Sequence, residues 1–363
     1  MHIQVRNLTK AYGSTVAVDD LSIDITDGEM LVLLGPSGCG KTTTMRSIVG
    51  LETPSTGTIK IGDETVFDSE RNINVPANRR HIGMVFQSYA IWPHMTVAQN
   101  VAYPLKMRTR KARAGLDIGQ KVDRALQTVG LQGLGDRGAS LLSGGQMQRV
   151  ALARSIIMEP RVLLLDEPLS NLDAKLRDRL RFELRDIQMS LGITAIYVTH
   201  DQDEALALAD RIAVMRQGKI VQLTDPVTMY REPNSAFVAD FIGTSNIFDG
   251  TFVGSSSRGS RVRLDDSGLE LETGAASFDE GAAVTVCIRP EDIVVEEGDA
   301  ERPNVWKGTV RVASFLGDHF RYSVALDQGP TLFALSHGSR AGLATGTTTQ
   351  IHIQPDRIQL LER

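Results

Sequence analysis

Apolar and polar positions follow two different patterns in the two parts of this chain. From residue 1 to about residue 240, short runs of Val, Ile and Leu alternate with segments of helical periodicity. We expect strands at residues 3–8, 30–34, 82–86, 162–165, 195–199 and 212–215. Buried strands that alternate with helices are typical of an α/β domain with a largely parallel sheet. Between about residues 92 and 157 helical periodicity dominates, which predicts a helical subdomain inserted into this domain.

Beyond about residue 240, Gly, Ser and Asp interrupt short runs rich in Val, Ile and Thr, such as AAVTVCIRP, KGTVRVASFLG and RYSVALDQG. Short strands with hairpin-like turns indicate an all-β domain, and we expect a small OB-like barrel. The segments IFDGTFVG and VWKGTVRV faintly resemble each other, which favours two similar groups of strands within one barrel. The predicted domains are residues 1–240 and residues 241–363.

Composition narrows the class of protein. The 363 residues and the 42% hydrophobic content suffice for two domains with buried cores. The net charge of -5 argues against a general nucleic-acid binder, so no nucleic-acid partner is expected. Cys39 and Cys287 form neither a disulfide framework nor a metal-binding spacing, and we expect buried thiols in a reducing compartment. No apolar run approaches the roughly 20 residues of a membrane helix, and the first residues lack signal-peptide features, so neither a membrane span nor export is expected.

A phosphate-binding loop is the first candidate for chemistry. The text GPSGCGKT fits the pattern G-x-x-x-x-G-K-[ST], follows the apolar run MLVLL and precedes a helical segment, so a tight glycine turn without a ligand is the weaker alternative. The backbone amides would close on a β-phosphate, Lys41 would neutralise phosphate oxygens and the Thr42 hydroxyl would ligate Mg²⁺. The predicted nucleotide-binding residues of this segment are Gly35, Pro36, Ser37, Gly38, Cys39, Gly40, Lys41, Thr42 and Thr43.

Polar side chains follow several other apolar runs. In RVLLLDEP, Asp166 is placed to hold the metal through water and Glu167 to polarise an attacking water. Gln87 follows IGMVF and offers a carbonyl oxygen to Mg²⁺, and His200 follows IYVT at the sheet edge where ligands gather, in reach of a γ-phosphate. Alone, the Asp-Glu pair and the histidine would be read as a solvated strand end and a structural residue; beside a phosphate loop the functional interpretation is favoured. Tyr12 is expected to stack on adenine, with an ordinary surface or core aromatic as the alternative.

A second glycine-rich helix start, LSGGQ, lies far downstream of the phosphate loop and contains Ser143, Gly144, Gly145 and Gln146. It forms a second potential anion site. With this segment, the chain resembles the nucleotide-binding subunits of ABC transporters over essentially its whole length. GPSGCGKTT is similar to the family's Walker A motif, VLLLDEP to Walker B, LSGGQMQRV to the signature, SNLD to the D-loop and VTHD to the H-loop, with Gln87 in the Q-loop and Tyr12 in the A-loop. Met147 stands where the commoner signature has glutamine, and we expect no loss of function from it.

The resemblance implies an α/β P-loop NTPase domain, with a RecA-like core and a helical subdomain, followed by the all-β barrel. In this family two nucleotide domains face each other head to tail, and each ATP lies between the Walker A motif of one subunit and the signature of the other. A homodimer that uses ATP and Mg²⁺ is therefore implied, with Ser143 and Gly145 completing the site of the opposite copy. The roles implied for single residues are general base for Glu167, γ-phosphate switch for His200 and connection between the two sites for Asp173; Thr42, Gln87 and Asp166 would hold the metal.

The C-terminal text resembles the accessory barrel of importer ATPases. This implies two membrane permease subunits, an extracytoplasmic solute-binding protein and a location at the cytoplasmic face of the cell membrane. GTSN and FLGDHFRYSV are more similar to the polyamine and ferric-iron branch than to the sugar branch, with sugar or glycerol phosphate as the next alternative. The aromatic segment that contains Trp92 and Tyr103 either belongs to the core or forms part of a groove for a coupling helix of the permease.

Three other classes compete with this interpretation. A non-transport ABC ATPase of DNA repair or of the ribosome tends to carry heptad arms, zinc-binding cysteines or a second cassette, which the sequence does not display. A catalytically silent binding module is disfavoured by Lys41, Asp166, Glu167 and His200. A P-loop kinase or GTPase would leave LSGGQ unexplained.

Overall fold

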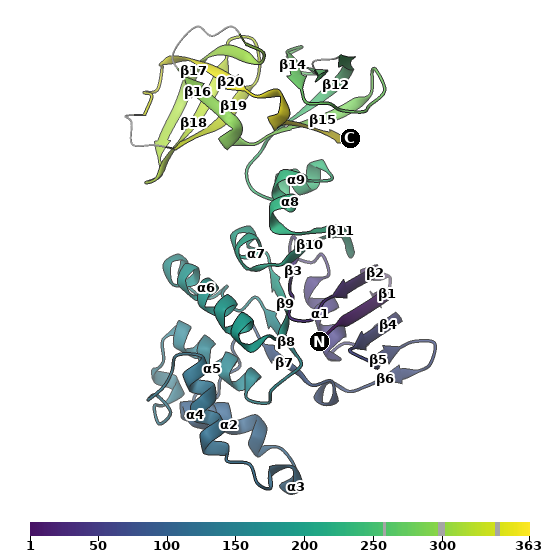
Figure 1. The fold of residues 1–363 in the computed structure, drawn as a ribbon, viewed down its shortest axis with the longest axis vertical. Helices are drawn as coiled ribbons and strands as arrows, with labels where there is room; N and C mark the ends of the chain where they lie inside the picture. The colour runs from purple at the N-terminus through teal and green to yellow at the C-terminus, as the bar shows by residue number, and fades with distance from the viewer. Residues whose placement is uncertain (257–258, 297–301, 338–341) are drawn as a thin grey trace. The chain divides into compact units, whose positions relative to one another are not determined.

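The computed structural model describes residues 1–256, 259–296, 302–337 and 342–363 of the chain. The protein divides into two compact units, Met1–Met229 and Tyr230–Arg363 (Figure 1). Each unit has its own hydrophobic core. In the described part of the chain, no helix is long and apolar enough to cross a membrane.

The first unit is built on a six-stranded sheet with the order β11-β10-β3-β9-β8-β7. Its strands are β3 (Met30–Leu34), β7 (Ile82–Val85), β8 (Val162–Asp166), β9 (Thr194–Thr199), β10 (Arg211–Arg216) and β11 (Lys219–Thr224). All neighbours are parallel except β10 and β11. Every residue of β3, β8 and β9 is buried, as expected for strands covered on both faces. The largely parallel sheet predicted from the apolar runs is confirmed.

The first unit also contains a second sheet, which is antiparallel. The sequence predicted only one, largely parallel sheet for this part of the chain. It has the order β2-β1-β4-β5-β6, with β1 (Ile3–Tyr12), β2 (Thr15–Ile25), β4 (Thr56–Ile61), β5 (Glu64–Asp68) and β6 (Ile73–Asn74). The strand expected at residues 3–8 therefore exists, but it pairs here and not in the parallel sheet. Buried and exposed positions alternate along the first part of β1, because only one face of this sheet meets the core.

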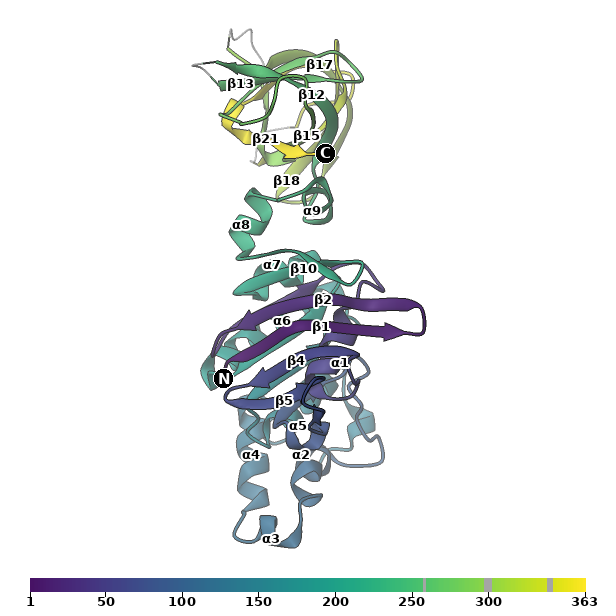
Figure 2. The same ribbon diagram turned by 90° about the vertical axis from the view of Figure 1, so that its right-hand side faces the viewer.

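Helices of the first unit fall into two groups. The described helices are α1 (Lys41–Val49), α2 (Val97–Lys106), α3 (Arg110–Arg113), α4 (Ile118–Thr128), α5 (Gly144–Ile156), α6 (Ala174–Leu191) and α7 (Gln202–Leu208), with the 3₁₀ turns η1 (Ala77–Arg79) and η2 (Ala139–Leu141). Helix α1 lies between the two sheets, and its Met45 and Ile48 belong to their common core (Figure 1). Helix α2 packs against α4 and α5, and Figure 2 shows this group with α3 at its tip. The group occupies the segment for which a helical subdomain was predicted.

In its described residues, the second unit contains two five-stranded antiparallel sheets around one core, which together form an OB-like barrel. The first has the order β14-β13-β12-β15-β21, with β12 (Asn246–Ser256), β13 (Gly259–Leu264), β14 (Glu270–Thr273), β15 (Ala283–Ile288) and β21 (Ile358–Glu362). The second has the order β16-β20-β17-β18-β19, with β16 (Ile293–Glu296), β17 (Val305–Phe315), β18 (His319–Leu326), β19 (Thr331–His337) and β20 (Thr348–Ile353). The 3₁₀ turns η3 (Pro290–Asp292) and η4 (Pro355–Arg357) precede β16 and β21. The two segments that resemble each other in sequence lie in β12 and β17, which are the central strands of the two sheets.

The change from the first unit to the second comes at Met229, upstream of the predicted boundary after residue 240. Two short helices cross or follow it, α8 (Pro226–Arg231) and α9 (Ala236–Phe241). The buried guanidinium of Arg289 donates hydrogen bonds to the backbone carbonyls of Tyr230 (2.8 Å), Ala239 (3.1 Å) and Ile242 (2.6 Å). Arg289 directly follows β15, and its charge-assisted hydrogen bonds hold the helical segment to the barrel. This explains why residues 230–240 group with the second unit.

Candidate active site

The phosphate loop joins β3 to α1 and depends on glycine at two positions. A Cβ at Gly35 would lie 2.4 Å from the carbonyl oxygen of Met215, and one at Gly40 would lie 2.4 Å from that of Ala17. Gly40 also has φ +106°, in the left-handed region that favours glycine, and it directly precedes the first residue of α1. The backbone can therefore pass close to its neighbours and leave the amides of the helix start free for an anion.

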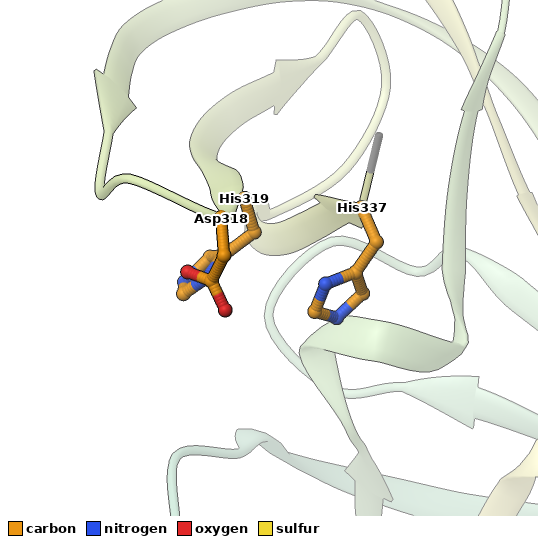
Figure 3. Close-up of side chains that lie close together, drawn as sticks. All are labelled: Asp318, His319 and His337. Carbon is orange, nitrogen blue, oxygen red and sulfur yellow. The ribbon is translucent and has the colours of Figure 1, made fainter. Parts of the chain in front are cut away.

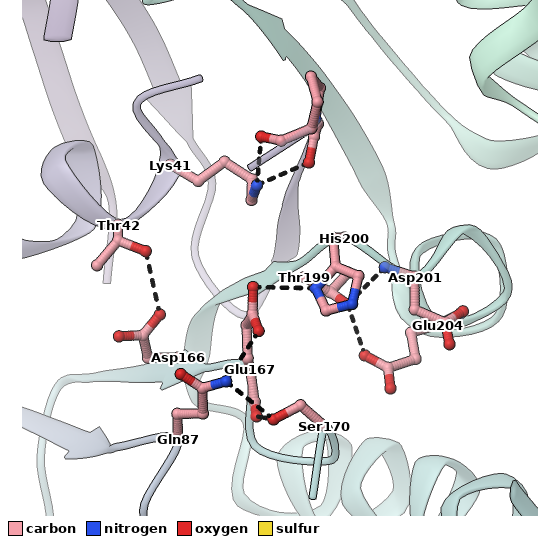
Figure 4. A network of polar contacts seen from close by, with 12 residues as sticks. Lys41, Thr42, Gln87, Asp166, Glu167, Ser170, Thr199, His200, Asp201 and Glu204 are labelled. Carbon is pink, nitrogen blue, oxygen red and sulfur yellow. Dashed lines mark hydrogen bonds and ion pairs between the residues drawn. The ribbon is translucent and has the colours of Figure 1, made fainter. Parts of the chain in front are cut away.

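Lys41 is the first residue of α1, and its side chain points toward the beginning of this loop. Its ammonium donates to the carbonyl oxygens of Gly35 (2.7 Å) and Pro36 (3.1 Å), and the side chain is 5% exposed (Figure 4). Pro36, Ser37 and Gly38 are exposed at the crest of the loop. The cation is thus held at the loop whose amides would face a phosphate.

Thr42 and Asp166 meet from the start of α1 and the end of β8. The Thr42 hydroxyl donates to a carboxylate oxygen of Asp166 at 3.4 Å. Burial raises the pKa of Asp166, and the positive charge of Arg46 partly opposes this effect. A hydroxyl beside a buried carboxylate is an oxygen donor set of the kind that Mg²⁺ prefers, so these residues fit the cation that was predicted for them.

Glu167 lies between Gln87 and His200 (Figure 4). One of its carboxylate oxygens is 3.1 Å from Nδ1 of His200, and the other accepts a hydrogen bond from the Gln87 amide nitrogen at 3.2 Å. Strand order explains the meeting, because the three side chains follow β8, β7 and β9, and β8 lies between the other two. The carboxyl ends of parallel strands share one edge of a sheet, where ligands bind in open α/β folds.

The backbone at Glu167 is strained. Its φ of +42° is uncommon for a residue with a Cβ, and such conformations cluster at functional sites. The Glu167 amide donates to the carbonyl of Val198 on β9 at 3.0 Å, which fixes the turn after β8. The carboxylate is consequently directed by backbone geometry as well as by its two neighbours.

Ser170 and Asn171 complete this network and were not among the predicted site residues. Ser170 accepts a hydrogen bond from the Gln87 amide nitrogen at 3.3 Å and donates to the Glu167 carbonyl at 2.9 Å. The Asn171 side chain donates to the Gln87 carbonyl at 2.9 Å. Their position in the SNLD segment was the available signal, although only Asp173 of that segment was assigned a role.

Hydrogen bonds on both sides of His200 fix the chain at the end of β9. The Thr199 hydroxyl donates to the buried carboxylate of Glu204 at 2.8 Å and accepts from the Asp201 amide at 3.0 Å. Tyr197 donates a further hydrogen bond to Glu204 at 2.8 Å. These contacts fix the segment on which the imidazole is carried.

The signature residues make local contacts at the start of α5. Ser143 is the N-cap, with the Gln146 amide donating to its hydroxyl at 3.4 Å and the Gln146 side chain accepting from the Ser143 amide at 3.1 Å. A Cβ at Gly145 would lie 3.2 Å from Leu176 and Leu180 of α6. Glycine here allows α5 to approach α6 closely, so Gly145 has a packing role in the single chain.

Asp173 and Tyr12 lie outside the network around Glu167. Asp173 caps α6, where its carboxylate accepts from the Leu176 amide at 3.0 Å. Tyr12 ends β1 with 47% of its surface exposed, and the Lys10 ammonium lies 4.7 Å from the ring centroid. An exposed ring is compatible with the base-stacking role predicted for Tyr12.

A groove lies beside the helical group, lined by residues that include Met84, Ala90, Trp92, Pro104 and Arg154, with a volume of about 330 Å³. The rings of Trp92 and Tyr103 are 4.2 Å apart, and the Arg154 guanidinium lies 4.8 Å from the Trp92 ring centroid. Trp92 is half-buried and lines this groove. Part of its ring therefore packs inside the protein, and part lies at the surface of the groove.

Comparison with known proteins agrees with this geometry. The ABC transporter family model matches residues 18–170, and the TOBE domain model matches residues 286–361. The Fe(3+) ions import ATP-binding protein FbpC 1 of Rhizobium meliloti (strain 1021) is 43% identical over 98% of this chain and 96% of its own length. The spermidine/putrescine import ATP-binding protein PotA 2 of Pseudomonas aeruginosa is 45% identical over 94% of this chain and 92% of its own length. The chain belongs to the ABC transporter ATP-binding family.

Two solved structures resemble part of this ABC ATPase. The cbiO1 protein of Clostridium perfringens has a TM-score of 0.55 at 32% identity and covers 62% of this chain and 88% of its own. The ATP-binding cassette MJ0796, solved as a dimer in a post-hydrolysis state with ADP and Pi, has a TM-score of 0.53 at 29% identity and covers 62% and 98%. The first unit is thus a nucleotide-binding ATPase domain, and the second is a TOBE domain.

Proposed function

We propose that this protein is the ATP-hydrolysing subunit of an ABC importer and works as a head-to-tail homodimer. The observation that carries the proposal is the position of Glu167, whose carboxylate lies between Gln87 and His200. A carboxylate held by an amide and an imidazole at the sheet edge that also carries the phosphate loop can receive a proton from an attacking water.

The half-site on one chain binds the phosphates of ATP. Lys41 exchanges its two backbone carbonyl contacts for β- and γ-phosphate oxygens, and the α1 amides receive the β-phosphate. Thr42, Asp166 and the side-chain oxygen of Gln87 would hold Mg²⁺, and the cation would neutralise phosphate charge when bound. The Gln87 amide nitrogen contacts Glu167 and Ser170. The same side chain would therefore contact both the metal, through its oxygen, and the general base, through its nitrogen.

Hydrolysis needs a water in line with the γ-phosphate. Glu167 orients this water and accepts its proton, while His200 donates a hydrogen bond to the γ-phosphate. The 3.1 Å contact between Glu167 and His200 would give way when a phosphate is bound. His200 then reports the presence of the γ-phosphate to the segment after β9.

The opposite copy supplies the other half of the cage. The Ser143 hydroxyl and the amides at the N-terminus of α5 form a second anion site, which the single chain leaves capped by its own Gln146. In the proposed dimer these groups meet the γ-phosphate held by the other copy. ATP therefore joins the two copies, and hydrolysis releases them.

Transport is proposed from the relatives and from the groove beside Trp92. The relatives named above are import ATP-binding proteins for Fe(3+) ions and for spermidine and putrescine. We therefore infer a complex with two permeases and a solute-binding protein, at the cytoplasmic face of the membrane, with ferric iron or a polyamine as the solute. The groove, with an apolar ring and a cation at its wall, has the character of a docking surface for a permease helix.

The test is size-exclusion chromatography of Glu167→Gln protein with and without Mg-ATP, which we expect to form an ATP-dependent dimer because hydrolysis is slowed by about 10²–10⁴-fold. Adding Ser143→Arg should abolish this dimer. Ser190→Arg, at an exposed serine near the end of α6, serves as the matched control and should leave the dimer intact. An ATP-dependent dimer that tolerates Ser143→Arg would contradict the shared site.

The solute is tested separately in cells. Uptake of labelled spermidine and of ferric iron is measured in a strain that lacks the gene, complemented by wild-type or Glu167→Gln protein. We expect one of the two solutes to be taken up only with the wild-type protein. Normal uptake of both by the variant would reject the role in import, even if the ATP-dependent dimer is found.

A further inference from the structure

Two histidines face each other on the barrel, at the end of the β18–β19 hairpin that lies opposite its turn. His319 begins β18, His337 ends β19, and the two residues are direct partners in the antiparallel register. Side chains of directly opposed residues lie on the same face of a sheet. Their ring centroids are 5.5 Å apart.

A carboxylate adjoins this pair. Asp318 precedes His319, and one of its oxygens is 2.7 Å from Nδ1 of that histidine. One donor atom from each of the three side chains lies within 4.8 Å of the others, and Figure 3 shows the carboxylate and the two rings gathered at the strand ends. None of these residues belongs to the ATP site, and no role was assigned to them above, although Asp318 and His319 lie within the segment FLGDHFRYSV.

We propose that Asp318, His319 and His337 bind a divalent transition-metal cation, with two imidazole nitrogens and one carboxylate oxygen as its ligands. Imidazole suits Zn²⁺, Ni²⁺ and Cu²⁺, whereas Mg²⁺ and Ca²⁺ prefer oxygen ligands throughout. Three protein ligands leave at least one coordination position open to water. The side chain of Asp318 is 80% exposed and that of His319 is 20% exposed, so the site exchanges its cation with solvent and is not a buried structural centre.

A positively charged side chain, Arg321, lies near the proposed site and opposes the binding of a metal cation. Arg321 lies two residues after His319 and on the same outer face, and it lines a cavity of about 240 Å³ with Leu335, its partner on β19. Its positive charge lowers the affinity of a neighbouring cation. Removal of this charge must therefore tighten metal binding, whereas removal of a ligand must weaken it.

The experiment is titration of nucleotide-free full-length protein with Zn²⁺ by isothermal calorimetry, with Co²⁺ absorption as a second probe. We expect saturable binding of one Zn²⁺ per chain at this site. His319→Ala and His337→Ala should each weaken it by about tenfold or more, and Arg321→Gln should strengthen it by about twofold to fivefold.

The matched control is His2→Ala, since His2 is 3.8 Å from Asp24 and, in the described part of the chain, belongs to no group of three metal-binding side chains. This variant should bind Zn²⁺ like the wild type. Absence of saturable binding in the wild type would overturn the proposal, and so would binding that is unchanged in the double variant His319→Ala/His337→Ala. The histidine substitutions are at the ends of their strands, and the opposite direction expected for Arg321→Gln does not depend on any loss of folding.

Discussion

Arg80 is a buried cation that holds the C-terminal end of the phosphate-loop helix. Only 2% of the residue is exposed. Its guanidinium donates to the carbonyls of Ser47 (2.8 Å) and Ile48 (2.8 Å) in the last turn of α1, to the Val75 carbonyl (2.7 Å) and to the Asn74 side chain (3.0 Å). Burial lowers the pKa of Arg80 to about 10, which still leaves the group charged at neutral pH. The cation satisfies carbonyls that the helix end leaves without an intrahelical partner.

We predict that Arg80→Met destabilises the first unit. The Ser47 carbonyl keeps a hydrogen bond from the Gly50 amide, and the exposed Asn74 side chain can turn to water. The carbonyls of Ile48, in a buried contact, and of Val75, in a partly buried one, lose the guanidinium, and an acceptor left unsatisfied away from water costs about 1–3 kcal/mol. The expected loss in the free energy of unfolding is therefore roughly 2–6 kcal/mol, which lowers the melting temperature of a unit of this size by at least about 4 °C.

The assay is a thermal melt of the full-length protein with and without ADP. The transition that ADP raises belongs to the ATPase unit, because a ligand stabilises only the unit that binds it. Arg79→Met is the matched control, since the neighbouring Arg79 is exposed. If the free energies of unfolding of Arg80→Met and of this control differ by less than about 0.5 kcal/mol, the reasoning about these carbonyls is refuted.

Three further predictions follow from single contacts. Gly35→Ala brings a Cβ to 2.4 Å from the Met215 carbonyl oxygen, so we expect a loss of about 1–3 kcal/mol in the ADP-responsive transition and a smaller ADP shift. Arg289→Met removes the hydrogen bonds of the guanidinium to the carbonyls of Tyr230, Ala239 and Ile242, of which Ala239 keeps one from Ser245, and it should lower the melting transition that does not respond to ADP. Burial raises the pKa of Glu204 above its ordinary value of 4.5 despite the donors Thr199 and Tyr197. The protonated carboxyl of Glu204 contributes stability that is fully present below about pH 4.5 and is lost as the pH rises through the raised pKa. Over this pH range, the free energy of unfolding of the wild type should therefore fall relative to that of Glu204→Gln. Urea unfolding at several pH values measures the difference.

Each of these predictions has a matched control variant. Gly138→Ala adds a Cβ with its nearest neighbour at 3.9 Å, and it should leave the ADP-responsive transition unchanged. Arg261→Met removes an exposed arginine of the barrel and should not shift the second transition. Asp203→Asn, one residue before Glu204 and exposed, should retain the wild-type pH dependence. Equal effects in a variant and its control would contradict the corresponding argument.

The strands of the parallel sheet and the positions of the motifs were readable from the sequence. Continuous apolar runs such as 162–165 mark strands buried on both faces, and the glycines and Lys41 of the phosphate loop have fixed spacing because they act within one turn of chain. The resemblance of the whole chain to one family added the roles proposed for the signature and the switch role proposed for His200. These features are local, so the order of residues along the chain contains them.

Only the tertiary structure decided how distant residues meet. Strand order brought Gln87 and His200 to opposite sides of Glu167, and one-sided burial assigned β1 to a separate antiparallel sheet. Arg289 is identified as the residue that joins the 230–242 segment to the barrel solely by its long-range hydrogen bonds. Contacts of this kind depend on strand pairing and on desolvation of particular charges, and both are set by the packing of segments that the sequence separates widely.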